Sequence, residues 1–432
     1  MKYLLLPFLG FTSWLVGCGP VVDTTSTSAS SSGSGGAGAS GGGGVGGSGG
    51  SSGVGGFGAG PSAPCVPLTK PSMPTVPLCG PGDAPCQVLH EEVLPVPPAY
   101  RNDAPALLLD PTCQPRILFS TAVGEYKGFY GVRGAEGGWE VSPTPFAMAT
   151  GGLVSIAPDL PVALANDGAF GASLWSFSAG GWNLVEDVPA EGTHFGRGFA
   201  LAKTGELFAG FRGPGDEYLF GRYGSSWNIE TLGGTPTPPA VAVSPEGKPH
   251  LIAWEAKNGA WELHWRAPPL PSELALAVSG SLQADVMRPA LAVTAADAQN
   301  PEGKPHILAL RTLQNFSAEV VYVTREGQDT WAVTVLEQVS PDERVYLLGI
   351  VTDEAGAVRL FYSRTNPAAP AAGRLIVASP HSDVGIPSAI VTEGFSPYGA
   401  TFERDGSGRI HVALYELGLS SDVDIRYMVL GP

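Results

Sequence analysis

Positive charge is scarce in this sequence. It has 24 Lys and Arg residues against 40 Asp and Glu, which gives a formal net charge of -16. No run of Lys or Arg offsets this charge, so the chain repels phosphate backbones and anionic lipid head groups. We therefore expect no nucleic acid partner.

Charges of either sign are also few, at 15% of residues, whereas 43% of residues are hydrophobic. The 60 Gly and 40 Pro residues disfavour long helices. This composition combines a disordered part with a well-buried core.

The N-terminus lacks the ~20 apolar residues that a transmembrane helix needs. Instead, Lys2 precedes an apolar run from Tyr3 to Val16, a pattern typical of a secretory signal peptide. The tetrad Leu15-Val-Gly-Cys18 resembles the bacterial lipobox. This resemblance implies removal of residues 1–17 and attachment of acyl chains such as palmitate to Cys18, which anchor a protein stably when two or more are present. The alternative is an ordinary cleaved signal with an incidental cysteine.

The residue after Cys18 is Gly19 and not the Asp that favours inner-membrane retention among lipoproteins. The resemblance therefore implies a bacterial cell envelope location, anchored in the outer membrane and facing the periplasm or the exterior.

From Thr24 to Gly60, within the segment 18–62, nearly every residue is Gly, Ser, Ala or Thr, which cannot bury enough apolar surface to offset chain entropy. We expect a flexible linker with an r.m.s. span of roughly 35 Å. Residues 63–85 are rich in proline, which stiffens the chain toward extended polyproline geometry and predicts a stalk.

Besides Cys18, four cysteines are present, at Cys65, Cys79, Cys86 and Cys113. An even number in an oxidising compartment predicts two disulfides, and the spacing leaves three pairings open. We favour Cys65 with Cys79 and Cys86 with Cys113, because the second bridge would fasten the stalk to the domain. A zinc site is the alternative, although the spacings lack the short paired interval of zinc ligands.

The rest of the chain repeats a pattern of apolar strand, acidic or Gly-bearing turn and second apolar strand. The turns Ser244-Pro-Glu-Gly247, Asn300-Pro-Glu-Gly303 and Asp405-Gly-Ser-Gly408 mark the clearest copies. Seven first strands are expected, near Pro105, Leu153, Gly198, Pro239, Pro289, Tyr346 and Gly399. Their spacing of roughly 40 to 57 residues is that of four-stranded propeller blades. We predict an all-β, seven-bladed β-propeller, with six or eight blades as alternatives.

The last unit ends after three strands, near Leu430, whereas a strand-like segment from Gln87 to Val96 precedes the first unit. We predict that this N-terminal strand completes the last blade, so that residues 86–432 form a closed ring without edge strands. Four tryptophans recur at the start of the outer strand and are predicted to pack between blades: Trp139, Trp182, Trp227 and Trp331.

Together these repeats resemble the sialidase-like (Asp-box-related) propellers of secreted bacterial proteins, over about Cys86 to Pro432. Active sialidases carry Ser-x-Asp-x-Gly-x-Thr-Trp boxes and an Arg between Phe and Ile-Pro. The nearest strings here are Gly327-Gln-Asp-Thr-Trp331 and Pro115-Arg-Ile-Leu118, and both depart from that pattern. No Gly-x-Ser-x-Gly elbow, P-loop or dinucleotide fingerprint occurs, so we predict no catalytic residue and no cofactor.

His250, His306 and His411 occupy equivalent positions in three second strands, where Arg116 and Arg359 stand in two other units. Different blades hold these imidazoles too far apart for metal bonds of ~2 Å. We predict that each bonds to a neighbouring blade and that no metal site is formed. Acidic turns such as the one at Asp405 lack the dense Asp alternation of calcium loops and are predicted to be ordinary turns.

The face where the second strands end is the predicted ligand-binding rim. Its residues are Phe211, Arg212, Trp254, Glu255, Arg311, Arg364, Tyr415 and Glu416. Exposed rings stack on sugars, and Arg grips carboxylates. The alternative is that the rings pack between blades and the charges pair with one another.

Anchor, tether and rim favour a non-enzymatic, surface-tethered propeller, a monomer, that binds a glycan, peptide or protein partner. One alternative is a sialidase-like glycan hydrolase or lyase with Arg and carboxylate groups at the mouth. A scaffold subunit of an envelope complex is the other.

Overall fold

The computed structural model describes residues 79, 86–95 and 104–431, with short gaps in loops and at strand ends. The chain divides into two units, Met1–Phe57 and Gly58–Pro432, and every described residue belongs to the second. The expected signal peptide, Cys18, the linker and Cys65 lie outside the described residues.

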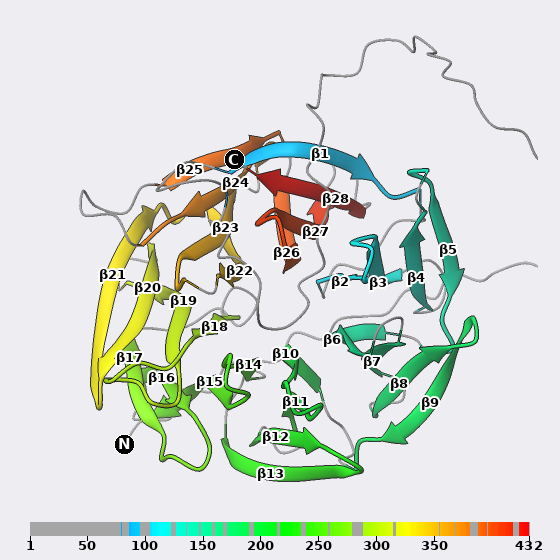
Figure 1. The fold of residues 1–432 in the computed structure, drawn as a ribbon. Helices are drawn as coiled ribbons and strands as arrows, with labels where there is room; N and C mark the ends of the chain where they lie inside the picture. The colour runs from blue at the N-terminus through cyan, green and yellow to red at the C-terminus, as the bar shows by residue number, and fades with distance from the viewer. Residues whose placement is uncertain are drawn as a thin grey trace, which may run out of the picture. The chain divides into compact units, whose positions relative to one another are not determined.

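Seven sheets of four strands each form the ring (Figure 1). Blade 1 contains β2 (Ala106–Leu109), β3 (Pro115–Thr121), β4 (Lys127–Arg133) and β5 (Trp139–Pro143). Blade 2 contains β6 (Met148–Ala157), β7 (Leu160–Asn166), β8 (Ala172–Ser178) and β9 (Gly181–Asp187). Blade 3 contains β10 (His194–Leu201), β11 (Leu207–Arg212), β12 (Glu217–Tyr223) and β13 (Trp227–Gly234). Blade 4 contains β14 (Ala240–Val243), β15 (Pro249–Lys257), β16 (Ala260–Arg266) and β17 (Glu273–Val278).

The remaining blades complete the circle. Blade 5 contains β18 (Ala290–Thr294), β19 (Lys304–Thr312), β20 (Ala318–Gly327) and β21 (Thr330–Val339). Blade 6 contains β22 (Arg344–Thr352), β23 (Val358–Asn366), β24 (Ala369–Ala378) and β25 (Ser388–Glu393). Blade 7 contains β26 (Ser396–Arg404), β27 (Ile410–Leu417), β28 (Val423–Gly431) and β1 (Gln87–Val93). The predicted seven-bladed propeller is confirmed, and each expected first strand is at or beside an inner strand.

The predicted ring closure is also confirmed, because β1 forms the outer strand of blade 7. It pairs antiparallel with β28, from Gln87 opposite Gly431 to Val93 opposite Arg426. Side chains reinforce this joint: Arg426 forms an ion pair with Glu91, and Arg133 of blade 1 donates to Glu92 at 2.7 Å. The described ring therefore closes through backbone hydrogen bonds between segments from the two ends of the chain.

The predicted disulfide pairing is wrong, because Cys79 is bonded to Cys86. Their Cα atoms lie 4.9 Å apart, across a short connection that contains Gly80, Pro81 and Gly82. This Cα separation is within the range for a disulfide. Cys113 is disulfide-bonded as well, and its partner lies outside the described residues.

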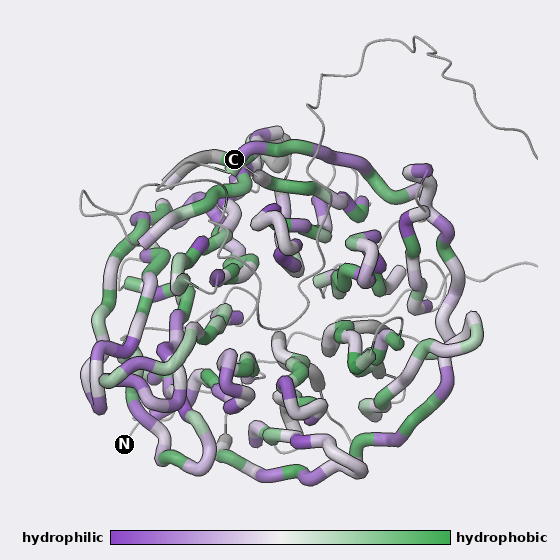
Figure 2. Tube along the Cα trace, in the orientation of Figure 1, coloured by the Kyte–Doolittle hydropathy of each residue, from purple (hydrophilic) through white to green (hydrophobic). Residues whose placement is uncertain are grey.

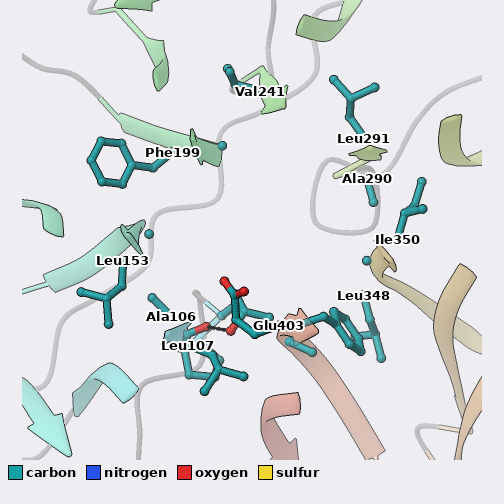
Figure 3. A pocket seen from close by; sticks show the side chains of 18 of the residues that line it. Ala106, Leu107, Leu153, Phe199, Val241, Ala290, Leu291, Leu348, Ile350 and Glu403 are labelled. Carbon is teal, nitrogen blue, oxygen red and sulfur yellow. Dashed lines mark hydrogen bonds between the residues drawn. The ribbon is translucent and has the colours of Figure 1, made fainter. Parts of the chain in front are cut away.

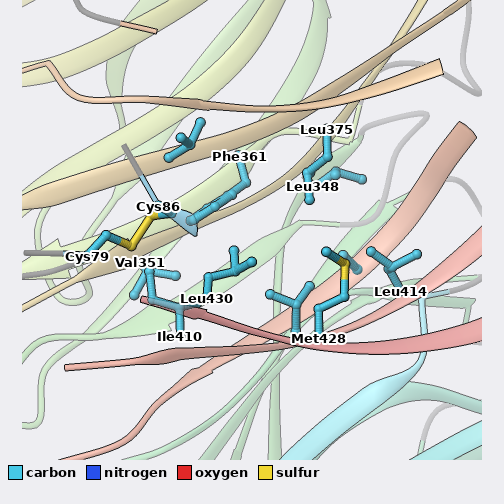
Figure 4. Packing of buried hydrophobic residues seen from close by; sticks show 13 residues of the cluster. Cys79, Cys86, Leu348, Val351, Phe361, Leu375, Ile410, Leu414, Met428 and Leu430 are labelled. Carbon is cyan, nitrogen blue, oxygen red and sulfur yellow. A yellow bond between two sulfur atoms is a disulfide. The ribbon is translucent and has the colours of Figure 1, made fainter. Parts of the chain in front are cut away.

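The core consists of seven apolar clusters, each between adjacent blades. One of them packs the Cys79–Cys86 bridge against Ile410, Met428 and Leu430 at the joint between blades 6 and 7 (Figure 4). The outer strands alternate between hydrophobic and hydrophilic residues, as expected for strands with one face toward a neighbouring blade (Figure 2).

Trp139, Trp182 and Trp331 pack between blades, as predicted. Trp139 makes an edge contact with Tyr427 of blade 7, and Trp182 makes one with Tyr130 of blade 1. Trp331 contacts Trp265 of blade 4. Trp227 packs edge-on against Phe211 of its own blade within the cluster between blades 2 and 3.

Glycines let the inner strands approach one another near the axis. A Cβ atom at Gly198 of β10 would lie 2.2 Å from the backbone nitrogen of Val241 in β14. At Gly349 of β22 it would lie 2.7 Å from the ring of Phe402 in β26. The channel at the centre of the ring is therefore as narrow as these glycine contacts allow.

Deleting residues 86–96 should abolish cooperative unfolding, because it removes the outer strand of blade 7 and exposes the edge of β28. Deleting residues 24–60 is the matched control and should leave the melting temperature unchanged. Circular dichroism melts of both variants check this prediction. Equal melting temperatures for the two deletions would show that β1 is dispensable for closure.

The substitution Gly198→Ala should lower the free energy of unfolding by about 1–3 kcal/mol, because the new methyl group clashes with the backbone of the next blade. Gly181→Ala is the control, since a Cβ atom there meets no atom within 4 Å. Denaturant titration measures both effects. An equal, small effect at the two sites would contradict the close approach.

Candidate functional site

The aromatic residues of the predicted rim are not exposed. Phe211 is 0% exposed, and Trp254 and Tyr415 are each 1% exposed. They belong to the clusters between blades 2 and 3, blades 4 and 5, and blades 7 and 1. The prediction that these rings form stacking platforms for sugars is therefore wrong. Each occupies the same position in its second strand, and that position faces the next sheet.

The charged residues of the predicted rim are engaged in ion pairs. Arg311 donates to Glu319 at 2.7 Å within blade 5. Arg364 bonds to Glu337 of blade 5 and to Glu343 beside β22. Glu416 accepts from Arg426 at 2.9 Å. The side chain of Arg212 lies outside the described residues. These pairs join neighbouring strands and blades. They agree with the alternative in which the charged residues of the rim pair with one another.

The equivalent histidines are hydrogen-bonded within the ring, and His250 bonds to a neighbouring blade, as predicted. Its Nε2 lies 2.8 Å from the carbonyl oxygen of Glu302 in blade 5, and its Nδ1 accepts from Trp265 at 3.2 Å. Burial lowers the pKa of His250 to about 4, so the ring is neutral at physiological pH.

His306 and His411 form hydrogen bonds within their own blades. The Nδ1 atom of each lies 2.6 Å from a tyrosine hydroxyl on the third strand, that of Tyr322 or Tyr427. His411 Nε2 lies 3.2 Å from Asp405 of the same blade, so the prediction of a bond to a neighbouring blade is wrong for His411. The repeated position therefore fastens the second strand to an aromatic residue on the third.

The acidic turns are ordinary turns, as predicted. Asp405 accepts hydrogen bonds from the backbone N–H groups of Ser407 and Arg409, at 2.8 and 3.0 Å. Its other oxygen lies 3.2 Å from His411 Nε2. Burial alone would raise the pKa of Asp405, but the bonds from His411 and Ser407 hold it below its ordinary value. Asp110 makes the same turn with Thr112 and Gln114.

A polar cluster lies on blade 4, where β15 and β16 meet. It consists of Glu255, Lys257, Glu262, His264 and Ser272, and we call it the blade 4 cluster. His264 Nε2 lies 2.9 Å from Glu262 and 3.8 Å from Glu255, and Lys257 lies 3.4 Å from Glu262. The side chains of the two glutamates are 18–29% exposed and that of Lys257 is 60% exposed, so the cluster is open to solvent.

The hydrogen bonds of His264 fix its tautomer. A carboxylate only accepts, so Nε2 carries the proton and donates to Glu262. Nδ1 is then free to accept from the Ser272 hydroxyl, 3.2 Å away. The bond from His264 lowers the pKa of Glu262. Across the gap between blades, burial and the charge of Glu255 raise the pKa of Tyr218 in blade 3 to about 12.

Of this cluster, the sequence identified only Glu255. The pairing register of blade 4 brings the others to it: Glu255 lies opposite Glu262, and His264 lies opposite Leu274, two residues from Ser272. An alternating Glu-x-His in a predicted third strand was the available signal, since residues two apart share one face.

A second candidate site is the cavity at the centre of the ring, with a volume of about 310 Å³. All seven inner strands contribute to it, and aliphatic side chains such as Leu153, Val241, Leu291 and Leu348 line it, with polar atoms exposed beside them. The ionisable residues of the lining are Arg288 and Glu403. Figure 3 shows the Glu403 carboxylate directed into the enclosed space.

Glu403 lies near the end of β26, opposite His411 in the register of blade 7. Enclosure by the ring raises its pKa to about 7, far above the ordinary value for glutamate. Among the described residues, no side chain forms a hydrogen bond or ion pair with its carboxylate. It was not predicted, because a single Glu in a strand carries no sequence signal for a central cavity.

Within the described ranges, no three His, Cys, Asp or Glu side chains are grouped closely enough to hold a metal ion. The part of the chain that the structure describes also contains no helix of the length and hydrophobicity needed to cross a membrane.

No family model matches the sequence, and neither does any curated protein. Among solved structures, AofleA from Arthrobotrys oligospora is 13% identical, with 70% of this chain and 90% of that chain covered and a TM-score of 0.42. The polysaccharide lyase Uly1 is 10% identical, with 80% and 99% covered and a TM-score of 0.47. The Aleuria aurantia lectin AAL is 10% identical, with 69% and 98% covered and a TM-score of 0.41. Similarity at this level identifies neither a ligand nor a reaction.

The substitution Glu403→Gln should stabilise the protein at pH 8 and have little effect at pH 4.5. The folded protein holds the Glu403 proton up to about pH 7, whereas the unfolded chain releases it near pH 4.5, so stability from this group is lost as pH rises between those values. Because the carboxylate is partly open to the cavity, we expect a gain of about 1–2 kcal/mol at pH 8.

Denaturant titrations at the two pH values measure this gain. Glu140→Gln, at an exposed position on β5, is the control and should change stability equally at both pH values. The same pH-independent behaviour in Glu403→Gln would contradict the raised pKa.

Proposed function

We propose that this chain is a non-enzymatic, lipid-anchored binding protein of a bacterial envelope. Its propeller is held at the end of a flexible tether and binds a glycan, peptide or protein partner through one face. The support for the anchor is the signal-like N-terminus with Cys18, followed by the Gly- and Ser-rich residues 18–62. The support for binding is the blade 4 cluster.

The N-terminal end of the ring is built in a way that suits a tethered protein. The Cys79–Cys86 disulfide lies in the chain directly ahead of β1. It is buried, with 0% and 4% exposure, in the cluster between blades 6 and 7. The chain that enters the ring is therefore fixed by a covalent link packed in the core, next to the strand that closes the ring.

The blade 4 cluster is the observation that carries the binding proposal. It gathers two carboxylates, an imidazole and an ammonium group at the surface, with Glu255 and Lys257 two residues apart at the end of β15. Such groups both donate and accept hydrogen bonds, which is what recognition of sugar hydroxyls or of a polar peptide requires. By contrast, Arg311 and Arg364 are held by glutamates and are less available to a ligand.

One specific arrangement favours the glycan hydrolase or lyase as the alternative. His264 lies between two carboxylates, with Ser272 at its other ring nitrogen, so the ring is oriented by fixed partners on both sides. An oriented imidazole beside carboxylates is the arrangement that general acid–base catalysis uses.

A glycan array and a depolymerisation screen on the same protein separate the two functions. The full chain with Cys18→Ser, which cannot receive the lipid, is the soluble form to test. We expect saturable binding to one class of glycan or peptide, at least tenfold weaker in Glu255→Ala and unchanged in Glu140→Gln, with no turnover. Turnover that His264→Gln abolishes would instead establish the enzyme, and binding unaffected by Glu255→Ala would remove the blade 4 cluster from the site.

Acylation of Cys18 should be detectable by incorporation of labelled palmitate when the chain is expressed in a bacterium. Cys18→Ser should abolish the label and move the protein from the membrane fraction to the soluble fraction. Cys65→Ser is the matched control and should retain the label. Loss of label in the control, or label that persists in Cys18→Ser, would contradict the lipobox resemblance.

A further inference from the structure

We propose that the central cavity is a binding site for a small organic ammonium ion, with the Glu403 carboxylate as its counter-ion. This site is separate from the blade 4 cluster and does not depend on the proposed function. It lies among the inner strands and not on an outer face of the ring.

The size of the cavity limits the ligand to a small molecule. About 310 Å³ is at the lower end of the range for small-molecule pockets, and it is too small for a polymer chain. The walls are fixed by close contacts between inner strands, such as Gly349 with Phe402 and Gly198 with Val241. Thr401 Oγ1 donates to the Pro105 carbonyl at 2.7 Å and fixes β26 against β2 (Figure 3).

The chemistry of the lining specifies the charge of the ligand. Burying a carboxylate in apolar surroundings costs free energy unless a cation or hydrogen-bond donor accompanies it. Glu403 has neither among the side chains of the described residues, and its raised pKa follows from enclosure alone. A ligand with a positive charge would remove this cost, whereas an anion or a neutral molecule would not.

The other ionisable residue of the lining does not take this role. Arg288 precedes β18 in blade 5, two blades from Glu403 in blade 7. It has interactions of its own, and the pKa of Glu403 is not lowered by it. A guanidinium group acting as counter-ion to Glu403 would lower that pKa.

The apolar wall favours an organic cation over an inorganic one. Metal ions such as Ca²⁺ take six to eight oxygen ligands, whereas the described lining offers one carboxylate. An ammonium group needs one counter-ion, and an alkyl chain attached to it would cover Leu291, Leu348 and Val241. The cavity therefore offers a counter-ion for the ammonium group and an apolar surface for the alkyl chain of an alkylammonium ion.

Isothermal titration with n-butylammonium, on the full chain carrying Cys18→Ser, tests the site. At pH 8 we expect saturable binding that is at least tenfold weaker in Glu403→Gln and unchanged in Glu140→Gln. The ligand binds the ionised carboxylate, so its affinity should fall about tenfold between pH 8 and pH 6, where a group with a pKa of about 7 is mostly protonated. Neutral 1-butanol should bind at least tenfold more weakly than n-butylammonium.

Proton release provides a second readout that needs no variant. Near pH 7 about half of the Glu403 carboxyls are protonated, so binding should release about half a proton per ligand. Titrations in buffers of different ionisation enthalpy measure that number. The proposal is overturned if 1-butanol binds as tightly as n-butylammonium, if no proton is released at pH 7, or if K⁺ or Ca²⁺ displaces the amine at equal concentration.

Discussion

The pairing of β1 with β28 is the interaction on which the rest of this structure depends. A ring of sheets is stable only if every blade has two neighbours, because each of the seven apolar clusters lies between blades. Blade 7 obtains its fourth strand from the opposite end of the chain, so seven residues of β1 complete a structure built by more than 300 others. Arg426 with Glu91 and Arg133 with Glu92 add charge pairs on both sides of this strand.

The buried histidines of the ring are all hydrogen-bonded. At the start of the second strand, His306 and His411 bond to tyrosines of the third strand, and His250 bonds to Trp265 and to the next blade. A buried polar group costs stability unless it is bonded, and here each imidazole uses both nitrogens. The three repeated histidines thus stabilise the blades through hydrogen bonds.

The sequence predicted the architecture because the repeated units recur at the spacing of four-stranded propeller blades. Turns such as Asp405-Gly-Ser-Gly408 need Asp and Gly for local reasons, so they mark several of the inner hairpins in the sequence alone. The missing fourth strand of the last unit and the strand-like Gln87–Val93 then predicted closure.

The prediction of an exposed aromatic rim was wrong because the position of a residue in the repeat does not show which face of the strand its side chain occupies. Phe211, Trp254 and Tyr415 share a repeat position, and that position faces a neighbouring sheet. The predicted disulfide pairing was wrong because cysteine spacing alone leaves three combinations open, and the structure bonds Cys79 to Cys86. Glu403 and His264 became visible only once strand register placed them, one toward the axis and one beside two glutamates.

Glu403 lies beside the joint that closes the ring, and this links the proposed cavity site to the stability of the fold. β26 contacts blade 1 through the bond from Thr401 to Pro105, and Tyr415 of the same blade accepts from the Ser120 N–H at 3.3 Å. An ionised carboxylate two residues from Thr401 adds a desolvation cost at this joint, whereas a bound cation would remove that cost. A ligand that binds the folded ring and not the unfolded chain stabilises the ring by RT ln(1 + [L]/Kd), so the stabilisation grows with ligand concentration. The cavity and the non-covalent joint between blades 7 and 1 are, on this argument, thermodynamically coupled through β26.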